Sequence, residues 1–294
     1  MSWVILSILA ALCWSVVNMV DKYVVTKWFK QPLVPVIMLG IIGLLASFLV
    51  YLTSGFTFLS YSKMTLALLT GIFYVLMSVF YFKALKIEEV SRIIPLFYLS
   101  PLFILFLAAI FLGEVFTLPK YLGIVLLVIG AILISSKNRL KLNFSKSFGW
   151  MMLSVISSSI SSLLTKYLLD FADYWTIFAY TRIGAAIGII PIAYIYLPEL
   201  INTVRKHGKK VVAVMSANEI LNLFAVLFII IATSIGYVTL VHALSAIQPF
   251  FVLLFVVILS IFYPSILKEE IGKSVILLKL LAIALMFIGA VLIT

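Results

Sequence analysis

The sequence predicts an all-α integral membrane protein with ten transmembrane helices, arranged as two inverted repeats of five helices. Three observations predict this fold: the composition, the length of the apolar blocks, and short patterns that return at a nearly constant shift. Of the 294 residues, 65% are hydrophobic and 11% are charged, whereas an average soluble domain has roughly 25% charged residues. The composition therefore excludes a soluble globular protein.

Apolar blocks of about 20 residues run along the chain, and an α-helix needs this length to cross a hydrocarbon core of roughly 30 Å. A transmembrane β-barrel would show shorter, alternating strands instead. Proline, glycine and charged residues mark the breaks between blocks. The first block lacks a basic leader region and a small-residue cleavage site, so we expect it to be retained rather than removed as a signal peptide. The expected spans are residues 3–22, 33–53, 63–83, 90–112, 117–135, 149–169, 175–197, 211–233, 237–262 and 274–294.

Short patterns of the first five spans return in the last five. The matching pairs are Lys22 with Lys166 at a shift of 144 residues, Pro101 with Pro249 at 148, and Gly130 with Gly289 at 159. Because five spans is an odd number, the second copy must cross the membrane in the opposite direction, as in the inverted repeats of many secondary transporters. The expected organisation is a first repeat at residues 1–136, a basic linker at 137–147 and a second repeat at 148–294.

Small residues recur seven positions apart in the fifth and tenth spans, as Gly123 and Gly130 and as Ala282 and Gly289. Small residues let membrane helices approach closely. The pattern predicts that these spans pack together. It leaves open whether the contact joins the two halves of one chain or two copies of it, so the choice between monomer and homodimer is undecided.

Several local patterns follow one another in a fixed order. They are an Ala-Leu-Lys turn at 84–86, a fourth span with Pro101, the triplet Leu-Gly-Glu at 112–114 followed by Thr117, and the glycine pair of the fifth span. In this order they resemble the EamA family of the drug/metabolite transporter superfamily over essentially the whole chain. The second half departs from the pattern, because a longer stretch around residues 268–270 replaces Leu-Gly-Glu. The resemblance implies a carrier, often an exporter, of small metabolites such as amino acids, drugs, sugars or nucleotide sugars. It also implies a central cavity lined by the first, third and fourth spans of each half.

The eighth expected span contains a carboxylate, Glu219, within the sequence MSANEILNL. A charged group at this depth is costly unless it is paired, protonated or facing water. Asn218 and Asn222 lie four residues apart on one helix face and Glu219 is three residues from Asn222, so the span carries a polar stripe. We expect these three residues to contact substrate, with Glu219 as a proton-coupling or cation-binding group. The alternative is a structural ion pair of Glu219 with Arg182 or Lys166.

The ninth span contains His242, with Ser245 three residues later. Because imidazole titrates near neutrality, His242 is a candidate for binding substrate or a proton; a hydrogen-bonded core histidine is the alternative. We expect Arg182 to be structural, since it resembles a basic residue common in the second helix of this family's repeats. Lys279 in the tenth span is expected to extend toward the membrane surface.

Proline recurs in the fourth and ninth spans, at Pro101 and Pro249. Each removes a backbone donor and crowds the carbonyl four residues earlier, at Phe97 and Ser245. Polar backbone at membrane depth persists where protein or a watery cavity satisfies it. We expect the two prolines to act as hinges beside the cavity, and kinks that only shape packing are the alternative.

The spans that the resemblance places around the cavity also carry aromatic and polar residues. Trp14 and Asn18 share a face of the first span with Asp21. With Tyr81 and Tyr98, the residues Trp14 and Asn18 are our candidates for the cavity wall. The sixth span presents a stripe of small hydroxyl residues, which favours close packing and leaves cavity lining open; its members are Ser154, Ser158, Ser161 and Thr165.

The net charge of +11 comes from basic residues at span ends, so we expect no nucleic-acid partner. Sixteen of the 21 Lys and Arg residues lie after the first, third, fifth, seventh and ninth spans. By the positive-inside rule this side is cytoplasmic, which places both termini outside. The family resemblance implies both termini inside, and we follow the charge distribution.

One cysteine, two histidines and the absence of HExxH and GxSxG sequences leave little material for catalysis. We therefore expect no enzyme, no catalytic residue, no metal site and no cofactor. Since the chain has no GxxxxGK(S/T) sequence, transport must be secondary. The expected function is export of small metabolites, such as amino acids or amphipathic compounds, by alternating access around a midplane cavity in the plasma membrane. The partners are then a small-molecule substrate, the lipid bilayer and protons as a candidate coupling ion. A lipid-flippase-like protein or a non-transporting membrane subunit of the same fold is the alternative.

Overall fold

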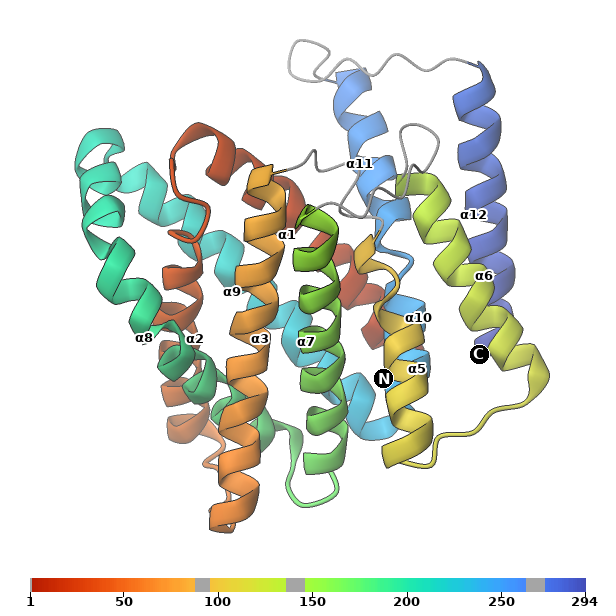
Figure 1. The fold of residues 1–294 in the computed structure, drawn as a ribbon, viewed down its shortest axis with the longest axis horizontal. Coiled ribbons are helices and arrows are strands. Elements are labelled where there is room, and N and C mark those ends of the chain that lie inside the picture. The colour runs from red at the N-terminus through yellow and green to blue at the C-terminus, as the bar shows by residue number, and fades with distance from the viewer. Residues whose placement is uncertain (1, 88–95, 136–145, 263–272) are drawn as a thin grey trace.

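The computed structural model describes residues 2–87, 96–135, 146–262 and 273–294, and these residues form helices and no strand (Figure 1). The helices of the first half are α1 (Trp3–Lys27), α2 (Val36–Thr53), α3 (Tyr61–Ile87), α5 (Ser100–Phe111) and α6 (Leu118–Ser135). Those of the second half are α7 (Lys146–Leu168), α8 (Tyr174–His207), α9 (Lys209–Ile235), α10 (Val238–Ser245), α11 (Gln248–Phe262) and α12 (Lys273–Ile293). Each expected span thus contains a described helix, while the expected linker lies almost wholly outside the described residues.

Seven described segments, of 18 to 34 residues, are long and apolar enough to cross a membrane. Shorter apolar helices cover Ser100–Phe111, Leu118–Ile134 and Leu278–Ile293. Large apolar side chains also lie exposed on the outer faces, including Phe48 on α2 and Phe106 on α5. An extensive apolar exterior of this kind is typical of a protein surface that contacts lipid.

Helix α8 is longer than expected, since it ends at His207 rather than near residue 197. Tertiary contacts extend the helix past the polar sequence that suggested a break. Leu200 is buried beside Phe29, and the Glu199 carboxylate accepts hydrogen bonds from the backbone N–H groups of Lys30 and Gln31, both at 3.0 Å. Packing of this kind outweighs local composition in setting where a helix ends.

The fourth and ninth expected spans are interrupted rather than smoothly kinked. Tyr98 and Leu99 form a turn before α5 begins at Ser100, and the turn at residues 246–247 separates α10 from α11. Pro101 and Pro249 each occupy the second position of the helix that follows. A proline there loses no helical hydrogen bond, because the first-turn N–H groups have no partner within the helix. The expected crowding is therefore relieved by a break just before each proline.

Glycines bring two pairs of helices into backbone contact. A Cβ atom on Gly123 would lie 2.8 Å from the carbonyl oxygen of Gly289, and one on Gly130 would lie 2.8 Å from that of Ala282. This confirms that the fifth and tenth spans meet at their small residues, and it places the contact within one chain, where α6 and α12 lie side by side (Figure 1). Helices α3 and α8 cross even more closely, at Gly71 and Gly184.

Glu114, the last residue of the Leu-Gly-Glu triplet, joins the two halves. Its side chain is 4% exposed and accepts hydrogen bonds from the backbone N–H groups of Val238 at 2.9 Å and Thr239 at 3.2 Å. These groups begin α10 and have no partner within the helix, and a carboxylate at a helix N-terminus also complements the helix dipole. The triplet therefore caps a helix of the opposite half. Residues 268–270, which replace the triplet in the second half, lie outside the described residues.

Hydroxyl groups of the sixth expected span bind α7 to α3. Ser154 donates to the carbonyl oxygen of Met77 at 2.9 Å, and Ser161 donates to that of Thr70 at 3.1 Å. This part of the stripe serves the packing between α3 and α7. Helices α1, α3, α6, α8 and α11 all end on the upper side of Figure 1, so the described basic residues at the ends of α1, α3 and α8 lie on one side of the bundle.

Candidate functional site

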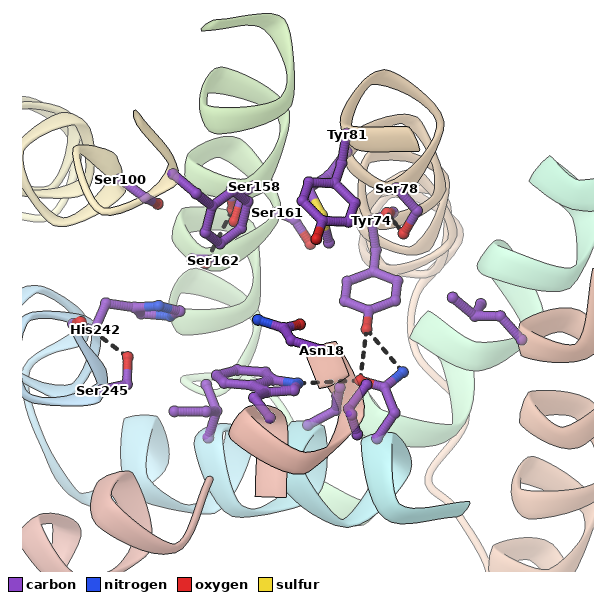
Figure 2. Close-up of a pocket in the computed structure, with 18 of the residues that line it drawn as sticks. Asn18, Tyr74, Ser78, Tyr81, Ser100, Ser158, Ser161, Ser162, His242 and Ser245 are labelled. Atoms are coloured by element: carbon purple, nitrogen blue, oxygen red, sulfur yellow. Dashed lines mark hydrogen bonds between the residues drawn. The ribbon is translucent and has the colours of Figure 1, made fainter. Parts of the chain in front are cut away.

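A cavity of about 230 Å³ lies between the two halves of the bundle. Its wall contains residues from α1, α2, α3 and α5 of the first half and from α7 to α11 of the second. In Figure 2, Tyr74 and Tyr81 from α3, Asn18 from α1 and His242 from α10 face a common space. Neither half alone supplies the whole wall.

A hydrogen-bonded network centred on Asn222 connects both halves at this wall. The indole N–H of Trp14 on α1 donates to Asn222 Oδ1 at 3.0 Å, and Asn222 Nδ2 donates to Glu219 Oε1 at 3.0 Å. The Tyr74 hydroxyl lies 3.2 Å from Asn222 Nδ2 and 3.3 Å from its Oδ1. Asn222 is 7% exposed, and buried polar networks of this kind fix side-chain positions when their members are satisfied.

A second carboxylate, Asp21 on α1, also lines the cavity and accepts a hydrogen bond of 2.7 Å from Asn218 Nδ2 on α9. Asn218 itself is not part of the cavity wall. Glu219 interacts electrostatically with both Asp21 and Arg182, so the three charged groups form one cluster. The carboxylates come from different halves and approach each other where α1 packs against α9.

Arg182, which we expected to be structural, is a residue of the cavity wall as well. Its side chain is 2% exposed, and its guanidinium carbon lies 4.5 Å from the centre of the Tyr74 ring and 5.8 Å from that of Phe178. A cation over an aromatic face is attracted by the negative charge at the centre of the ring. Gly43 lies beside the aliphatic part of the arginine, where a Cβ would be at an ordinary van der Waals distance of 3.6 Å from Arg182 Cδ.

His242 lines the cavity on the other side, next to the break between α10 and α11. The Ser245 hydroxyl donates to the backbone carbonyl of His242 at 2.9 Å rather than to its imidazole ring (Figure 2). Gln248, just after the break, also reaches the wall, and its Nε2 has no hydrogen-bond partner among the described residues. Polar side chains thus flank this interruption, as expected where a broken helix borders a cavity.

The structure brings most of the candidate residues together. Glu219, Asn222, His242, Trp14, Asn18, Tyr81, Tyr98 and Pro101 line the cavity, as do Ser158, Ser161 and Thr165 of the hydroxyl stripe. Asn218 stands behind the wall, and Pro249 is buried elsewhere in the described bundle. The substrate-binding, coupling and hinge roles of these residues stay predictions.

Lys166 binds other groups, so the expected alternative of an ion pair between Lys166 and Glu219 is wrong. Its Nζ instead donates to the carbonyl oxygens of Thr233 at 3.0 Å and Gly236 at 2.9 Å, at the end of α9. Positive charge is favourable at a helix C-terminus. Lys166 therefore stabilises the end of α9.

Asp21 and Arg182 are wall residues that were not among the candidates. The helical spacing of Trp14, Asn18 and Asp21 was a signal for the first of these. The second carried no comparable signal, because a single intramembrane arginine is consistent with a structural or a functional role.

Residues 1–136 match the EamA-like transporter family, the same family that the sequence motifs resemble. The chain belongs to the EamA-like transporter family. It is therefore a multi-pass membrane protein of a transporter family that is generally non-enzymatic, and membership implies a small-molecule substrate and a bilayer environment.

Two further similarities concern length and fold. The chain is 31% identical over 136 residues to the uncharacterized protein MJ1333.1 of Methanocaldococcus jannaschii, and the aligned region is 46% of this chain and 97% of the relative. A solved structure described as "Crystal structure of protein" covers 99% of this chain and 96% of its own, with a TM-score of 0.70 and 17% sequence identity. The second similarity extends the shared fold across both halves of this member of the EamA-like family.

Proposed function

We propose that this protein is a secondary transporter that exports small metabolites across the cell membrane by alternating access around the cavity between its halves. The observation that carries the proposal is the polar network of the cavity wall, in which Asp21 and Trp14 of α1 bind Asn218 and Asn222 of α9. Ionisable groups within membrane helices are costly and mark substrate or ion pathways. Glu219 and His242 are the proposed groups for substrate contact or coupling.

The pattern of helix packing supports the proposed pair of inverted repeats. Helix α1 packs against α9 and α7 against α3, which is the same contact with the two halves exchanged. The pairs α2–α8 and α6–α12 each join equivalent helices. Transporters built on inverted repeats bind substrate near the bilayer midplane and expose it alternately to each side. The interruptions before Pro101 and Pro249 are the proposed hinges for that motion.

Reconstitution tests the proposal directly. Purified protein in proteoliposomes is assayed for uptake of a panel of amino acids and amphipathic compounds, with and without a pH gradient. We expect transport that the gradient stimulates, and loss of that stimulation in Glu219→Gln. The control is Glu199→Gln, because Glu199 lies near the end of α8 and binds only a connecting segment.

Two results would change this assignment. Gradient dependence that persists in Glu219→Gln would remove Glu219 from the coupling role. Movement of a fluorescent phospholipid in the same vesicles, without uptake of any metabolite, would replace the proposal with the flippase-like alternative.

Orientation follows from the charge distribution, which favours a cytoplasmic position for the basic ends of the helices and an external position for both termini. A reporter that is active only in the cytoplasm, fused after Thr294, is expected to stay dark. A bright reporter would support the usual family orientation instead.

A further inference from the structure

The guanidinium of Arg182 has donors that nothing in the described structure uses. The side chain is 2% exposed and belongs to the cavity wall, yet Nε and Nη1 have no hydrogen-bond partner among the described residues. Buried polar groups are nearly always hydrogen-bonded, and a buried donor without an acceptor is costly. Two free donors of one guanidinium beside a cavity therefore indicate a place for an acceptor that comes with a ligand.

The surroundings of Arg182 hold it in place without occupying those donors. The Tyr74 ring covers one face of the guanidinium, with 4.5 Å between the guanidinium carbon and the ring centre, and Tyr74 is itself held by Asn222. Gly43 packs against the aliphatic part of the arginine. The planar fork of a guanidinium fits a carboxylate through two parallel hydrogen bonds, so an oriented arginine with free donors suits this group.

The charges around Arg182 restrict the ligand further. Asp21 and Glu219 line the same cavity and interact electrostatically with each other, and Glu219 also interacts with Arg182. When all three groups are ionised, the cluster has one negative charge in excess. A purely anionic ligand would increase the excess, whereas a purely cationic ligand would leave the arginine donors unused. A ligand with both charges satisfies the arginine and one or both carboxylates.

We propose that Arg182 binds the carboxylate of a zwitterionic substrate whose cationic group faces Asp21 and Glu219. This inference rests on the proposed transport function and defines its substrate class. The remaining wall offers apolar surface for the body of the substrate, from Met77, Tyr81, Phe97 and Tyr98. The cavity volume of about 230 Å³ limits the substrate to a small metabolite.

Compounds that share one body and differ only in charge test the assignment. The first set is L-leucine, 3-methylbutylamine and 4-methylpentanoate, and the second is L-phenylalanine, 2-phenylethylamine and 3-phenylpropionate. Binding to the purified full-length protein in nanodiscs is measured by calorimetry. In at least one set, we expect the amino acid to bind about tenfold or more tightly than the amine or the acid, because each of these lacks one charge-assisted contact.

Substitutions should then act according to charge. Arg182→Gln is expected to weaken the binding of the amino acid and of the acid about tenfold or more, because it removes the group that binds their carboxylate. The affinity of the amine should not change. Asp21→Asn and Glu219→Gln should weaken the binding of the amino acid and of the amine but not that of the acid. Arg205→Gln, on the exposed end of the same helix, is the matched control and should change none of the affinities.

Folding of the variants is checked by size-exclusion chromatography. If Arg182→Gln does not fold, Arg182→Lys replaces it in the test. It retains the charge but loses the planar fork, so the amino acid should bind with intermediate affinity.

The inference is overturned if an amine binds the unsubstituted protein as tightly as its amino acid, if Arg182→Gln weakens all three compounds of a set equally, or if none of the six compounds binds. Failure of the proposed function looks different, since no compound of the wider panel would then be transported while the binding pattern still decides the role of Arg182.

Discussion

Helices α3 and α8 cross in close backbone contact, whereas α9 and α2, the corresponding helices of the expected repeats, cross less closely. A shift of 148 residues relates Gly71 on α3 to Glu219 on α9, and a shift of 144 relates Gly40 on α2 to Gly184 on α8. A Cβ on Gly71 would lie 2.1 Å from the carbonyl oxygen of Thr181, so α3 and α8 touch backbone to backbone. Glu219 lines the cavity instead, and α2 and α9 contact each other only sparsely.

This difference means that the expected repeats contribute unequally to the cavity wall. At one crossing the absence of side chains allows the helices to close the wall. At the other, α9 carries the carboxylate of Glu219 and its hydrogen-bonding partner Asn222, and both side chains line the cavity. If the expected repeats are aligned, one position is a packing contact in the first half and a charged wall residue in the second. Substitutions at Gly71 and Glu219 should therefore have opposite consequences.

Gly71→Ala should have the largest effect on stability, because the added methyl group forces α3 and α8 apart where they cross. The added Cβ meets backbone atoms of Thr181 and Ala185 at 2.1 Å and 2.4 Å, and backbone cannot move aside as a flexible side chain can. Overpacking usually costs roughly 1–3 kcal/mol, and we expect Gly71→Ala to reduce the free energy of unfolding by at least the upper end of this range. The measurement is unfolding in mixed micelles. Gly149→Ala on α7 is the control, since nothing lies within 4 Å of its Cβ position. Equal stability of the two variants would show that the crossing is not tightly packed.

Glu114→Ala tests the contact by which the first half of the chain caps α10 of the second half. The substitution leaves the N–H groups of Val238 and Thr239 buried without acceptors, which costs about 1–3 kcal/mol. The measurement is again the free energy of unfolding. Glu199→Ala serves as the comparison, because it releases the exposed N–H of Lys30 and the only partly buried N–H of Gln31, which should cost less than two fully buried groups. A larger loss in Glu199→Ala would contradict the proposed importance of burial.

Asp173 caps the first turn of α8, one of the two helices of the α3–α8 crossing, and its contribution to stability should depend on pH. Burial alone would raise the pKa of Asp173, but hydrogen bonds from the Thr176 hydroxyl and from the backbone N–H groups of Thr176 and Trp175 outweigh it and lower the pKa below 3.8. Because the folded-state pKa is lower than the unfolded one, the stabilisation is present above pH 3.8 and is lost as the pH falls through the folded value. Asp173→Ala should therefore cost about 1 kcal/mol at pH 7, and unfolding measured at pH 3 should show a smaller difference. A difference that does not change with pH would contradict the ionised cap.

Glu219→Ala should have the smallest effect on stability, although it changes the residue equivalent to Gly71. The substitution removes one hydrogen bond with Asn222 but also removes a charge from an enclosed site, and the two contributions offset to within about 1 kcal/mol. Transport should nevertheless fall strongly. Unfolding and uptake measured on the same preparation separate the two effects, and a loss of stability as large as that of Gly71→Ala would remove the contrast between the crossings.

The sequence was sufficient for the helices and for one of the contacts between them. Apolar block length located the described helices, and the spacing of Gly123 and Gly130 predicted the contact of α6 with α12. The end of α8 was wrong by ten residues, because the packing of Leu200 and the hydrogen bonds of Glu199 involve residues far away in the chain. The ten-span inverted arrangement as a whole stays a prediction.

The sequence indicated several residues of the cavity wall but not the partners that they bind. The polar stripe of α9 identified Glu219 and Asn222, yet the Trp14 indole that binds Asn222 lies 208 residues away in the chain. Arg182 shows the same limit more sharply. Its unused donors are a property of the folded cavity, and no spacing in the sequence indicates whether a buried arginine has found an acceptor.

The unequal crossings also have an evolutionary consequence. The relative from Methanocaldococcus jannaschii aligns over nearly its whole length with 136 residues, which is the length of one expected repeat. A carrier assembled from two identical chains of that length must place the same residue at both crossings, because a single gene encodes both. A glycine that closes one would close the other, and an acid at one would appear at both. Gene fusion removes this constraint, since each copy then accumulates its own mutations, and it allows one half to be selected for packing while the other is selected for what it binds.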